Sequence, residues 1–226
     1  MESLDAELDR ARALDEAALA DAIETIGFEC TRCGECCTAD PKPTVDDEDG
    51  EQAADPHTAT VFPGEVRDLT DETGRAWNDV ARPMPYGLDA SGEGETFEWA
   101  LQTTACGDCT FYTEKNGQGA CTVHEDRPLI CETYPFSVAL GGTSQPMGEA
   151  VAESGMVRAH ECEGLGRDIS REDAEAMASA LKERAVRELE EAIAVRDNYE
   201  PARPDSGAVV HDSEGAKRPD GTPYEG

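Results

Sequence analysis

The residues most able to do chemistry in this sequence are nine cysteines, four of which fall within residues 30–37. Thiolates separated by two residues can converge on one soft, tetrahedral metal centre, because the intervening pair forms a tight turn. Gly34 favours such a turn, since glycine adopts left-handed backbone conformations without a steric penalty. The cysteines predict a metal-binding framework whose candidate ligands are Cys30, Cys33, Cys36, Cys37, Cys106, Cys109, Cys121, Cys131 and Cys162.

These cysteines are expected to be reduced thiols and not disulfides. The N-terminus lacks the basic and apolar regions of a secretory signal peptide, and no apolar run approaches the length needed to span a membrane. This pattern predicts a cytoplasmic protein, and thiols are normally kept reduced in that compartment. An odd number of cysteines also fits complete disulfide pairing poorly.

Four thiolates complete either a Zn(Cys)4 site or a 4Fe-4S cluster, so nine cysteines suffice for two centres. Side chains of adjacent residues in extended backbone point in opposite directions, so Cys36 and Cys37 are expected to face two centres or two parts of one cluster. The first predicted centre uses Cys30, Cys33, Cys36 and Cys131. The second uses Cys37, Cys106, Cys109 and Cys121. The alternative is one centre, with the other cysteines structural.

Several nearby residues have competing interpretations. Pro128 suits the first turn of a short helix, which would place Cys131 near the positive end of that helix and lower the pKa of its thiol. The Cys-x2-Cys pair at 106–109 lacks the βαβ pattern that surrounds thioredoxin-like redox centres, which favours a ligand role. His124 and His160 are weaker candidate ligands, because sulfur ligands are already in excess.

The cysteine pattern resembles that of the YkgJ-type cysteine cluster family. The resemblance covers roughly residues 28–166 and includes eight cysteines in order, together with an Arg-Pro dipeptide before Cys131 and a Pro-Phe dipeptide after it. The family is described as a zinc- or iron-chelating domain and is often labelled an iron-sulfur protein. A related cysteine pattern accompanies flagellin lysine N-methylases. His124 and Glu132 depart from the residue types common in the family.

The resemblance implies a bound cofactor, either an iron-sulfur cluster, with 4Fe-4S favoured, or zinc. It also implies a ligand role for Cys162, which matches a late cysteine of the family. Arg127 is the candidate residue for contact with the cofactor, because a guanidinium beside a thiolate-bound centre offsets its negative charge. An ordinary salt bridge is the alternative role for Arg127.

The charge of the chain excludes two classes of partner. Asp and Glu total 50 against 19 Lys and Arg, for a formal net charge of −31. Such a charge repels nucleic acid phosphates and anionic membrane surfaces, so neither is expected as a partner. The carboxylates are spread along the whole chain, which is typical of a halophilic protein whose self-repulsion is screened by concentrated salt.

Three functions fit these observations. The first is a metal-binding protein with an electron-transfer or accessory role, acting with a protein redox partner. The second is an iron-sulfur oxidoreductase or a lysine N-methylase-like enzyme with a protein substrate, although Cys-x2-Cys-x2-Cys is not the Cys-x3-Cys-x2-Cys spacing of radical S-adenosylmethionine enzymes. The third is a structural zinc module for protein interaction.

The elements expected around the cysteines place the chain in the α+β class. We predict an N-terminal helical segment at 1–27, a cysteine-cluster metal-binding domain at 28–166, a C-terminal helix at 167–199 packed on that domain, and a disordered tail at 200–226 that is rich in Pro, Gly, Asp and Ser.

Local sequence signals give the bounds of several elements. Asp15 and Ser170 are predicted helix N-caps, Gly27 a helix end, and a short helix is predicted from Pro63 to about Gly74. Strands are predicted at 96–101, 110–112, 120–123 and 137–140, with loops at 38–57 and 75–95. The C-terminal helix has an apolar stripe that is expected to be packing surface, formed by Ala174, Met177, Ala178, Leu181, Ala185, Leu189 and Ile193.

Overall fold

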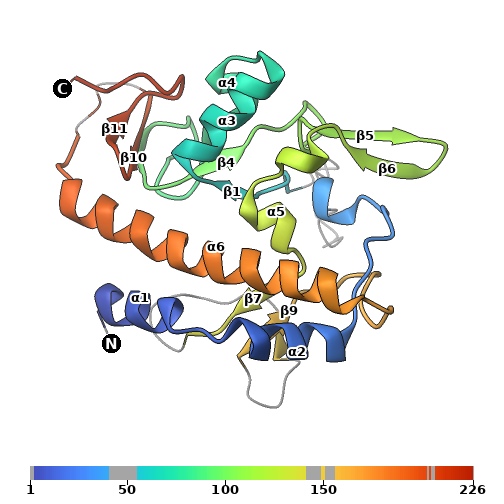
Figure 1. Ribbon diagram of the computed structural model, residues 1–226. Helices are drawn as coiled ribbons and strands as arrows, with labels where there is room; N and C mark the ends of the chain where they lie inside the picture. The colour runs from blue at the N-terminus through green and yellow to red at the C-terminus, as the bar shows by residue number, and fades with distance from the viewer. Residues whose placement is uncertain are drawn as a thin grey trace, which may run out of the picture. The chain divides into compact units, whose positions relative to one another are not determined.

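The computed structural model describes residues 3–40, 55–140, 149–150, 156–202, 204 and 207–225. The chain forms two compact units, each built from two separate stretches of sequence. Unit 1 contains Met1–Thr31 and Arg127–Tyr199, and unit 2 contains Arg32–Asp126 and Glu200–Gly226. Both helices and short strands are present, so the predicted α+β class is confirmed (Figure 1). The units differ from the division expected from sequence, because each combines early and late parts of the chain.

Unit 1 is built around its longest helix. It contains α1 (Leu4–Arg12), α2 (Glu16–Ile26), α5 (Leu129–Thr133) and α6 (Arg171–Asn198). Its antiparallel sheet has the order β7 (Phe136–Val138), β9 (Val157–Ala159) and β8 (Glu149–Ala150). The helices α1 and α2 both pack along α6 (Figure 1).

The helix bounds in unit 1 follow local capping signals. The Asp15 carboxylate accepts hydrogen bonds from the backbone N–H groups of Ala17 and Ala18, and Ser170 accepts one from Asp173. Gly27 ends α2 with a φ of 74°, a conformation that glycine adopts without strain. These predicted caps are confirmed. The predicted N-terminal helical segment consists of two helices, with Asp15 beginning the second.

A hydrophobic core holds unit 1 together. Leu19 and Ile23 of α2 pack in one cluster with Phe136, Val157 and the apolar stripe of α6. The stripe is therefore packing surface, as predicted. Each of the nine cysteines lies in the described part of the chain, and none belongs to this cluster. The core of unit 1 is thus built from apolar side chains without a contribution from thiols.

Within its described residues, unit 2 contains three small sheets and two α-helices. One antiparallel sheet has the order β1 (Thr60–Val61), β4 (Trp99–Leu101) and β2 (Ala81–Pro83). A second has the order β11 (Gly215–Lys217), β10 (Ala208–Asp212) and β3 (Gly94–Thr96), and a hairpin joins β5 (Tyr112–Lys115) to β6 (Gln118–Cys121). The helices are α3 (Pro63–Thr73), which ends at Gly74 as predicted, and α4 (Trp77–Val80).

The predicted disordered tail is wrong for much of its length, because β10 and β11 lie in it. β10 pairs in parallel with β3 and buries Val209 and Val210. Two contacts anchor Asp212, since its Oδ2 accepts hydrogen bonds from Trp99 Nε1 at 2.8 Å and from Lys217 Nζ at 2.8 Å. The composition of the tail is dominated by Pro, Gly and polar residues, so the short apolar strand β10 was not predicted. Its partner β3 lies more than a hundred residues earlier in the chain.

Three further predictions about unit 2 need correction. The predicted strand 96–101 is two strands, β3 and β4, and the predicted loop 75–95 contains α4 and β2. Asn116 and Gly117 alone form the hairpin turn, with φ values of 56° and 77°, so β5 and β6 extend into the interval between the strands predicted at 110–112 and 120–123. Most of the predicted loop 38–57 lies outside the described residues.

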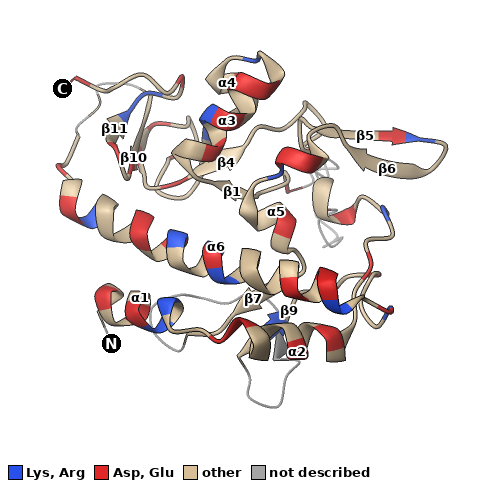
Figure 2. Cartoon of the chain, viewed as in Figure 1, with Lys and Arg blue, Asp and Glu red and all other residues tan. Residues whose placement is uncertain are grey.

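Acidic side chains lie on helices and strands of both units (Figure 2). Among the residues that the structure describes, no helix has the length and apolar character needed to cross a membrane.

Candidate metal centre

Cys36 and Cys37 lie in a short 3-10 turn, Glu35–Cys37, that begins at Gly34 with a φ of 89°. Their Sγ atoms are 3.8 Å apart. The expectation that these two side chains point in opposite directions is wrong, because it assumed extended backbone. Two sulfurs bound to one tetrahedral ion at about 2.3 Å lie about 3.8 Å from each other. The pair therefore has the separation that a single shared metal ion requires.

Cys109 is attached directly to this turn. Its backbone N–H donates a hydrogen bond of 2.8 Å to the carbonyl oxygen of Cys37, and a β-bridge pairs Cys109 with Thr103. The side chain is buried, with 6% of the residue exposed. Two segments about seventy residues apart in sequence are thus held together at their cysteines.

The hairpin β5–β6 adds Cys121 to the same region. Cys121 ends β6 opposite Tyr112 of β5, and Tyr112 donates a backbone hydrogen bond of 3.0 Å to the carbonyl oxygen of Cys109. The pKa of the Cys109 thiol is raised to about 11, mainly by burial and to a smaller extent by the nearby thiols of Cys121 and Cys36. Unit 2 therefore places Cys36, Cys37, Cys109 and Cys121 on neighbouring backbone segments.

Four thiols from three segments match the donor set of a Zn(Cys)4 site. Within the part of the chain that is described, no group of three or more His, Cys, Asp or Glu side chains is placed so that it could hold a metal ion. The chemistry of the donors and the Cys36–Cys37 separation nevertheless fit a tetrahedral, sulfur-bound ion. Bound zinc or iron would supply positive charge that stabilises the thiolate form of a buried cysteine such as Cys109.

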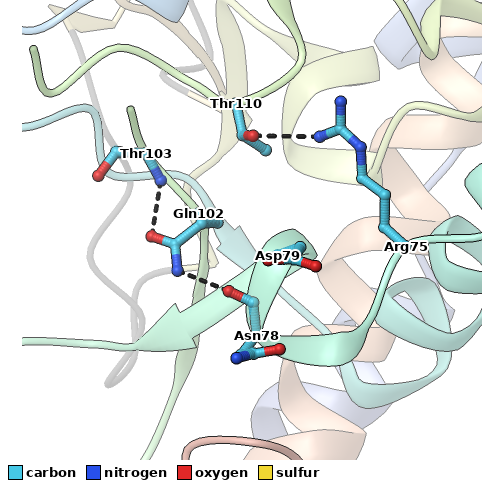
Figure 3. Close-up of a pocket in the computed structure, with 6 residues that line it drawn as sticks. All are labelled: Arg75, Asn78, Asp79, Gln102, Thr103 and Thr110. Carbon is cyan, nitrogen blue, oxygen red and sulfur yellow. Dashed lines mark hydrogen bonds between the residues drawn. The ribbon is translucent and has the colours of Figure 1, made fainter. Parts of the chain in front are cut away.

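The segment that carries Cys109 is also held by the lining of an open pocket of about 460 Å³. Figure 3 shows Arg75 directed at Thr110, whose Oγ1 accepts a hydrogen bond of 3.1 Å from Arg75 Nη1. Gln102 donates to the carbonyl oxygen of Asn78 at 2.7 Å and accepts from the backbone N–H of Thr103 at 2.9 Å. These pocket groups therefore bond to one another and hold Thr110, which follows Cys109, and Thr103, which pairs with Cys109.

The other cysteines of unit 2, Cys33 and Cys106, are exposed. Cys33 follows Arg32, whose carbonyl oxygen accepts a hydrogen bond of 2.9 Å from Gly119 in β6. Cys106 lies in a loop where its backbone N–H donates to Thr104 Oγ1 at 3.3 Å. Cys106 therefore differs from the buried Cys109 with which it forms a Cys-x2-Cys pair.

Unit 1 contains the remaining cysteines, Cys30, Cys131 and Cys162. Glu29 donates a backbone hydrogen bond of 3.1 Å to Gly164, which places the segment of Cys30 beside that of Cys162. Cys131 is the third residue of α5, the short helix that begins directly after Pro128. The Tyr134 hydroxyl, just beyond this helix, donates to the carbonyl oxygen of Glu161 at 3.0 Å. The first predicted centre combines cysteines of both units, and it stays a prediction.

Other predicted site residues have ordinary surroundings. His124 is half exposed and its Nδ1 lies 3.1 Å from Glu125 Oε1, while the ring of His160 packs against Tyr134. Arg127 is half-buried, and its contact with a cofactor stays a prediction.

Sequence reasoning missed His57, which the fold places beside the Cys106–Cys109 loop. Its backbone N–H donates to the carbonyl oxygen of Gly107 at 2.8 Å, and its own carbonyl oxygen accepts from Arg82 Nη2 at 2.9 Å. Burial, followed by the Arg82 guanidinium, lowers the pKa of the His57 imidazole. No local signal identified His57, because it is far from this loop in sequence.

The nine thiols, several of them on neighbouring backbone segments of unit 2, define a cysteine-rich class of protein. A family model matches residues 29–163, more than half of the chain, and it carries the name CxxCxxCC and the description "Putative zinc- or iron-chelating domain". The chain belongs to this family. A search of curated proteins and a search of solved structures each found no match. Membership supports metal binding and leaves open the choice between zinc and iron.

Proposed function

We propose that this protein binds a single zinc or iron ion through Cys36, Cys37, Cys109 and Cys121 of unit 2. The observation that carries the proposal is the distance of 3.8 Å between the sulfurs of Cys36 and Cys37. This distance is that of two ligands on one tetrahedral ion. Cys109 and Cys121 supply the other two thiolates from neighbouring backbone segments.

The same distance favours a single ion over a 4Fe-4S cluster at these four residues. In a 4Fe-4S cluster each of the four irons takes one cysteine, so no two ligand sulfurs share a metal ion. Two sulfurs as close as those of Cys36 and Cys37 can instead bind the same metal ion. The proposed ligand set differs from the second centre predicted from sequence in one position, because Cys36 takes the place of Cys106.

The ion would have a structural role in unit 2. A tetrahedral site with four protein ligands is closed, which is typical of structural and not of catalytic zinc. It would join three parts of the chain: the turn Glu35–Cys37, the segment ending at Cys109, and the hairpin β5–β6. Because a preformed site rarely exists in an unfolded chain, the binding free energy adds to the folding free energy.

Electron transfer is the second candidate function, and the exposure of Cys36 favours it. An iron ion with a ligand at the surface is accessible to a protein redox partner. The net charge of −31 would then lower the reduction potential, because negative charge disfavours the reduced centre. This role requires iron, and the oxidoreductase and N-methylase-like roles stay predictions from sequence.

Single Cys→Ser variants test the ligand assignment. We expect Cys36→Ser, Cys37→Ser, Cys109→Ser and Cys121→Ser each to lower the affinity for the ion by at least about tenfold, since each removes a thiolate ligand. The matched control is Cys106→Ser, which should keep the affinity of the unchanged protein.

The measurement is metal content after oxygen-free purification, followed by competition with a chelator. The proposed ligand set is wrong if Cys106→Ser loses the ion while Cys36→Ser retains it. That outcome would instead support the second centre predicted from sequence.

A further inference from the structure

Tyr112 contacts every segment that carries a cysteine of the proposed centre. It is the first residue of β5 and pairs with Cys121 across the hairpin. Its backbone N–H donates a hydrogen bond of 3.0 Å to the carbonyl oxygen of Cys109. The backbone of this one residue therefore joins two of the three segments.

The Tyr112 ring reaches the third segment through two glycines. A Cβ atom at Gly34 would collide with the Tyr112 hydroxyl, and a Cβ atom at Gly119 would lie 2.8 Å from Cε2 of the ring. Gly34 begins the turn that carries Cys36 and Cys37, and Gly119 lies in β6. The ring can occupy this place only because neither position has a side chain.

A backbone hydrogen bond joins the two segments that lie next to the Tyr112 ring. Gly119 donates from its backbone N–H to the carbonyl oxygen of Arg32 at 2.9 Å, so the chain leading into the turn is attached to β6 beneath Tyr112. The Tyr112 hydroxyl donates to Glu114 Oε2 at 3.3 Å on the exposed side. The hydroxyl and the adjoining ring atoms Cζ and Cε2 all lie against Gly34, so the hydroxyl end of the ring contacts the turn while it also bonds to Glu114.

We infer that Tyr112 is a positioning residue for the metal centre, and this inference rests on the proposed function. The aromatic ring holds the Cys36–Cys37 turn against Cys109 and Cys121 before an ion binds. Metal affinity depends on such supporting groups, because ligands that are already ordered lose less conformational entropy on binding. A rigid ring with two rotatable bonds suits this role.

The test compares metal affinity in Tyr112→Leu, Tyr112→Phe and the control Tyr86→Leu. Tyr86 belongs to the same unit and is 74% exposed. We expect Tyr112→Leu to weaken binding of Co²⁺ or Zn²⁺ by about 10- to 100-fold, the usual effect of losing a supporting group. Tyr112→Phe keeps the ring atoms that lie against Gly34 and Gly119 and should bind more tightly than Tyr112→Leu, whereas Tyr86→Leu should bind as tightly as the unchanged protein.

The absorption spectrum of bound Co²⁺ gives a readout that general destabilisation would not change. We expect Tyr112→Leu to alter the thiolate-to-cobalt bands at saturating metal, because the turn no longer presents both sulfurs in the same geometry. Unchanged bands together with unchanged affinity would overturn the inference. The proposed function would still stand in that case if the Cys→Ser variants lose the ion, and it fails separately if the unchanged protein binds none.

A second pair of variants covers the case in which Tyr112→Leu does not fold. Gly34→Ala places a Cβ against the ring, whereas Gly74→Ala introduces the same unfavourable positive φ at a site with nothing within 4 Å. We expect Gly34→Ala to weaken metal binding much more than Gly74→Ala does. Equal affinity in the two variants would contradict a positioning role for Tyr112.

Discussion

Cys36 and Cys37 show how one backbone angle changes the chemistry of a motif. In extended backbone their side chains would diverge, but Gly34 begins a 3-10 turn that brings the two sulfurs to 3.8 Å. The left-handed φ of 89° at Gly34 is the local condition for this turn. The cysteine spacing alone did not contain this information, because Cys-x2-Cys-Cys is compatible with both geometries.

Glu214 is a second single residue whose surroundings allow a prediction. It lies in a network of ion pairs at the β10–β11 turn. Its carboxylate contacts Arg67 at 2.6 Å and Lys217 at 2.7 Å. The hydrogen bond from Arg67, followed by that from Lys217, lowers the pKa of Glu214 from 4.5 to about 2. A lowered pKa means that the ionised carboxylate stabilises the folded state. This contribution is fully present above about pH 4.5 and is lost as the pH falls toward about 2.

We therefore expect Glu214→Gln to be less stable than the unchanged protein near neutral pH, with the difference shrinking as the pH falls through this window. Urea unfolding at several pH values measures this difference in the free energy of unfolding. Metal-free protein is used, because protonation of metal-bound thiolates then makes no contribution to the pH dependence. A difference that stays constant down to about pH 2 would contradict the lowered pKa.

At the scale of elements, α5 depends on a buried arginine of α6. Arg184 donates from Nη1 to Thr133 Oγ1 at 3.0 Å and to the carbonyl oxygen of Phe136 at 3.4 Å, and from Nε to Glu188 at 2.7 Å. Thr133 is fully buried at the end of α5. A helix of five residues has little stability of its own, so this contact fixes the helix that carries Cys131.

We expect Arg184→Met to lower the free energy of unfolding by about 2–3 kcal/mol, because it leaves buried hydrogen-bond acceptors without their charged donor. The control is Arg171→Met in the same helix, where the guanidinium bonds three carboxylates but is 40% exposed. Ion pairs at an exposed position are screened by solvent and contribute little, so this change should be milder. Urea unfolding followed by far-UV circular dichroism compares the two. Equal stability of both variants would contradict the role of Arg184.

Helix ends were predictable and strand pairing was not, for a physical reason. The Asp15 and Ser170 caps and the Gly27 end depend on neighbours within a few residues, so the sequence shows them directly. The pairing of β10 with β3 joins residues more than a hundred positions apart and depends on tertiary packing. Metal binding was predictable from the cysteine spacing and is supported by the family match, but the grouping of the cysteines depends on the same long-range contacts and stays a prediction.

At the scale of the whole molecule, apolar burial stabilises both units. The core of unit 1 includes side chains of α1, α2 and α6, and unit 2 buries Leu69, Trp99 and Phe111. The proposed ion would add a further link between segments of unit 2. Metal coordination is therefore not what stabilises the whole fold. Its contribution to the folding free energy is expected to be concentrated in unit 2, near the thiols.

Removal of the metal should make the unfolding transitions of the two units distinguishable by spectroscopy. Both tryptophans, Trp77 and Trp99, belong to unit 2, so fluorescence reports on that unit, while far-UV circular dichroism is dominated by the long helices of unit 1. We expect a chelator to lower the midpoint of the fluorescence-detected unfolding transition and to leave the helical transition nearly unchanged, because only unit 2 loses binding free energy. Transitions that shift together by the same amount would show that the ion stabilises both units.

X-ray absorption at the metal edge of protein purified without oxygen tests the central claim most directly. A variant with Cys30→Ser, Cys131→Ser and Cys162→Ser confines the measurement to the cysteines of unit 2. The account predicts one zinc or iron ion per chain with four sulfur neighbours at about 2.3 Å and no second metal nearby. An iron–iron distance in the spectrum, fewer than four sulfur neighbours, or no bound ion would contradict it.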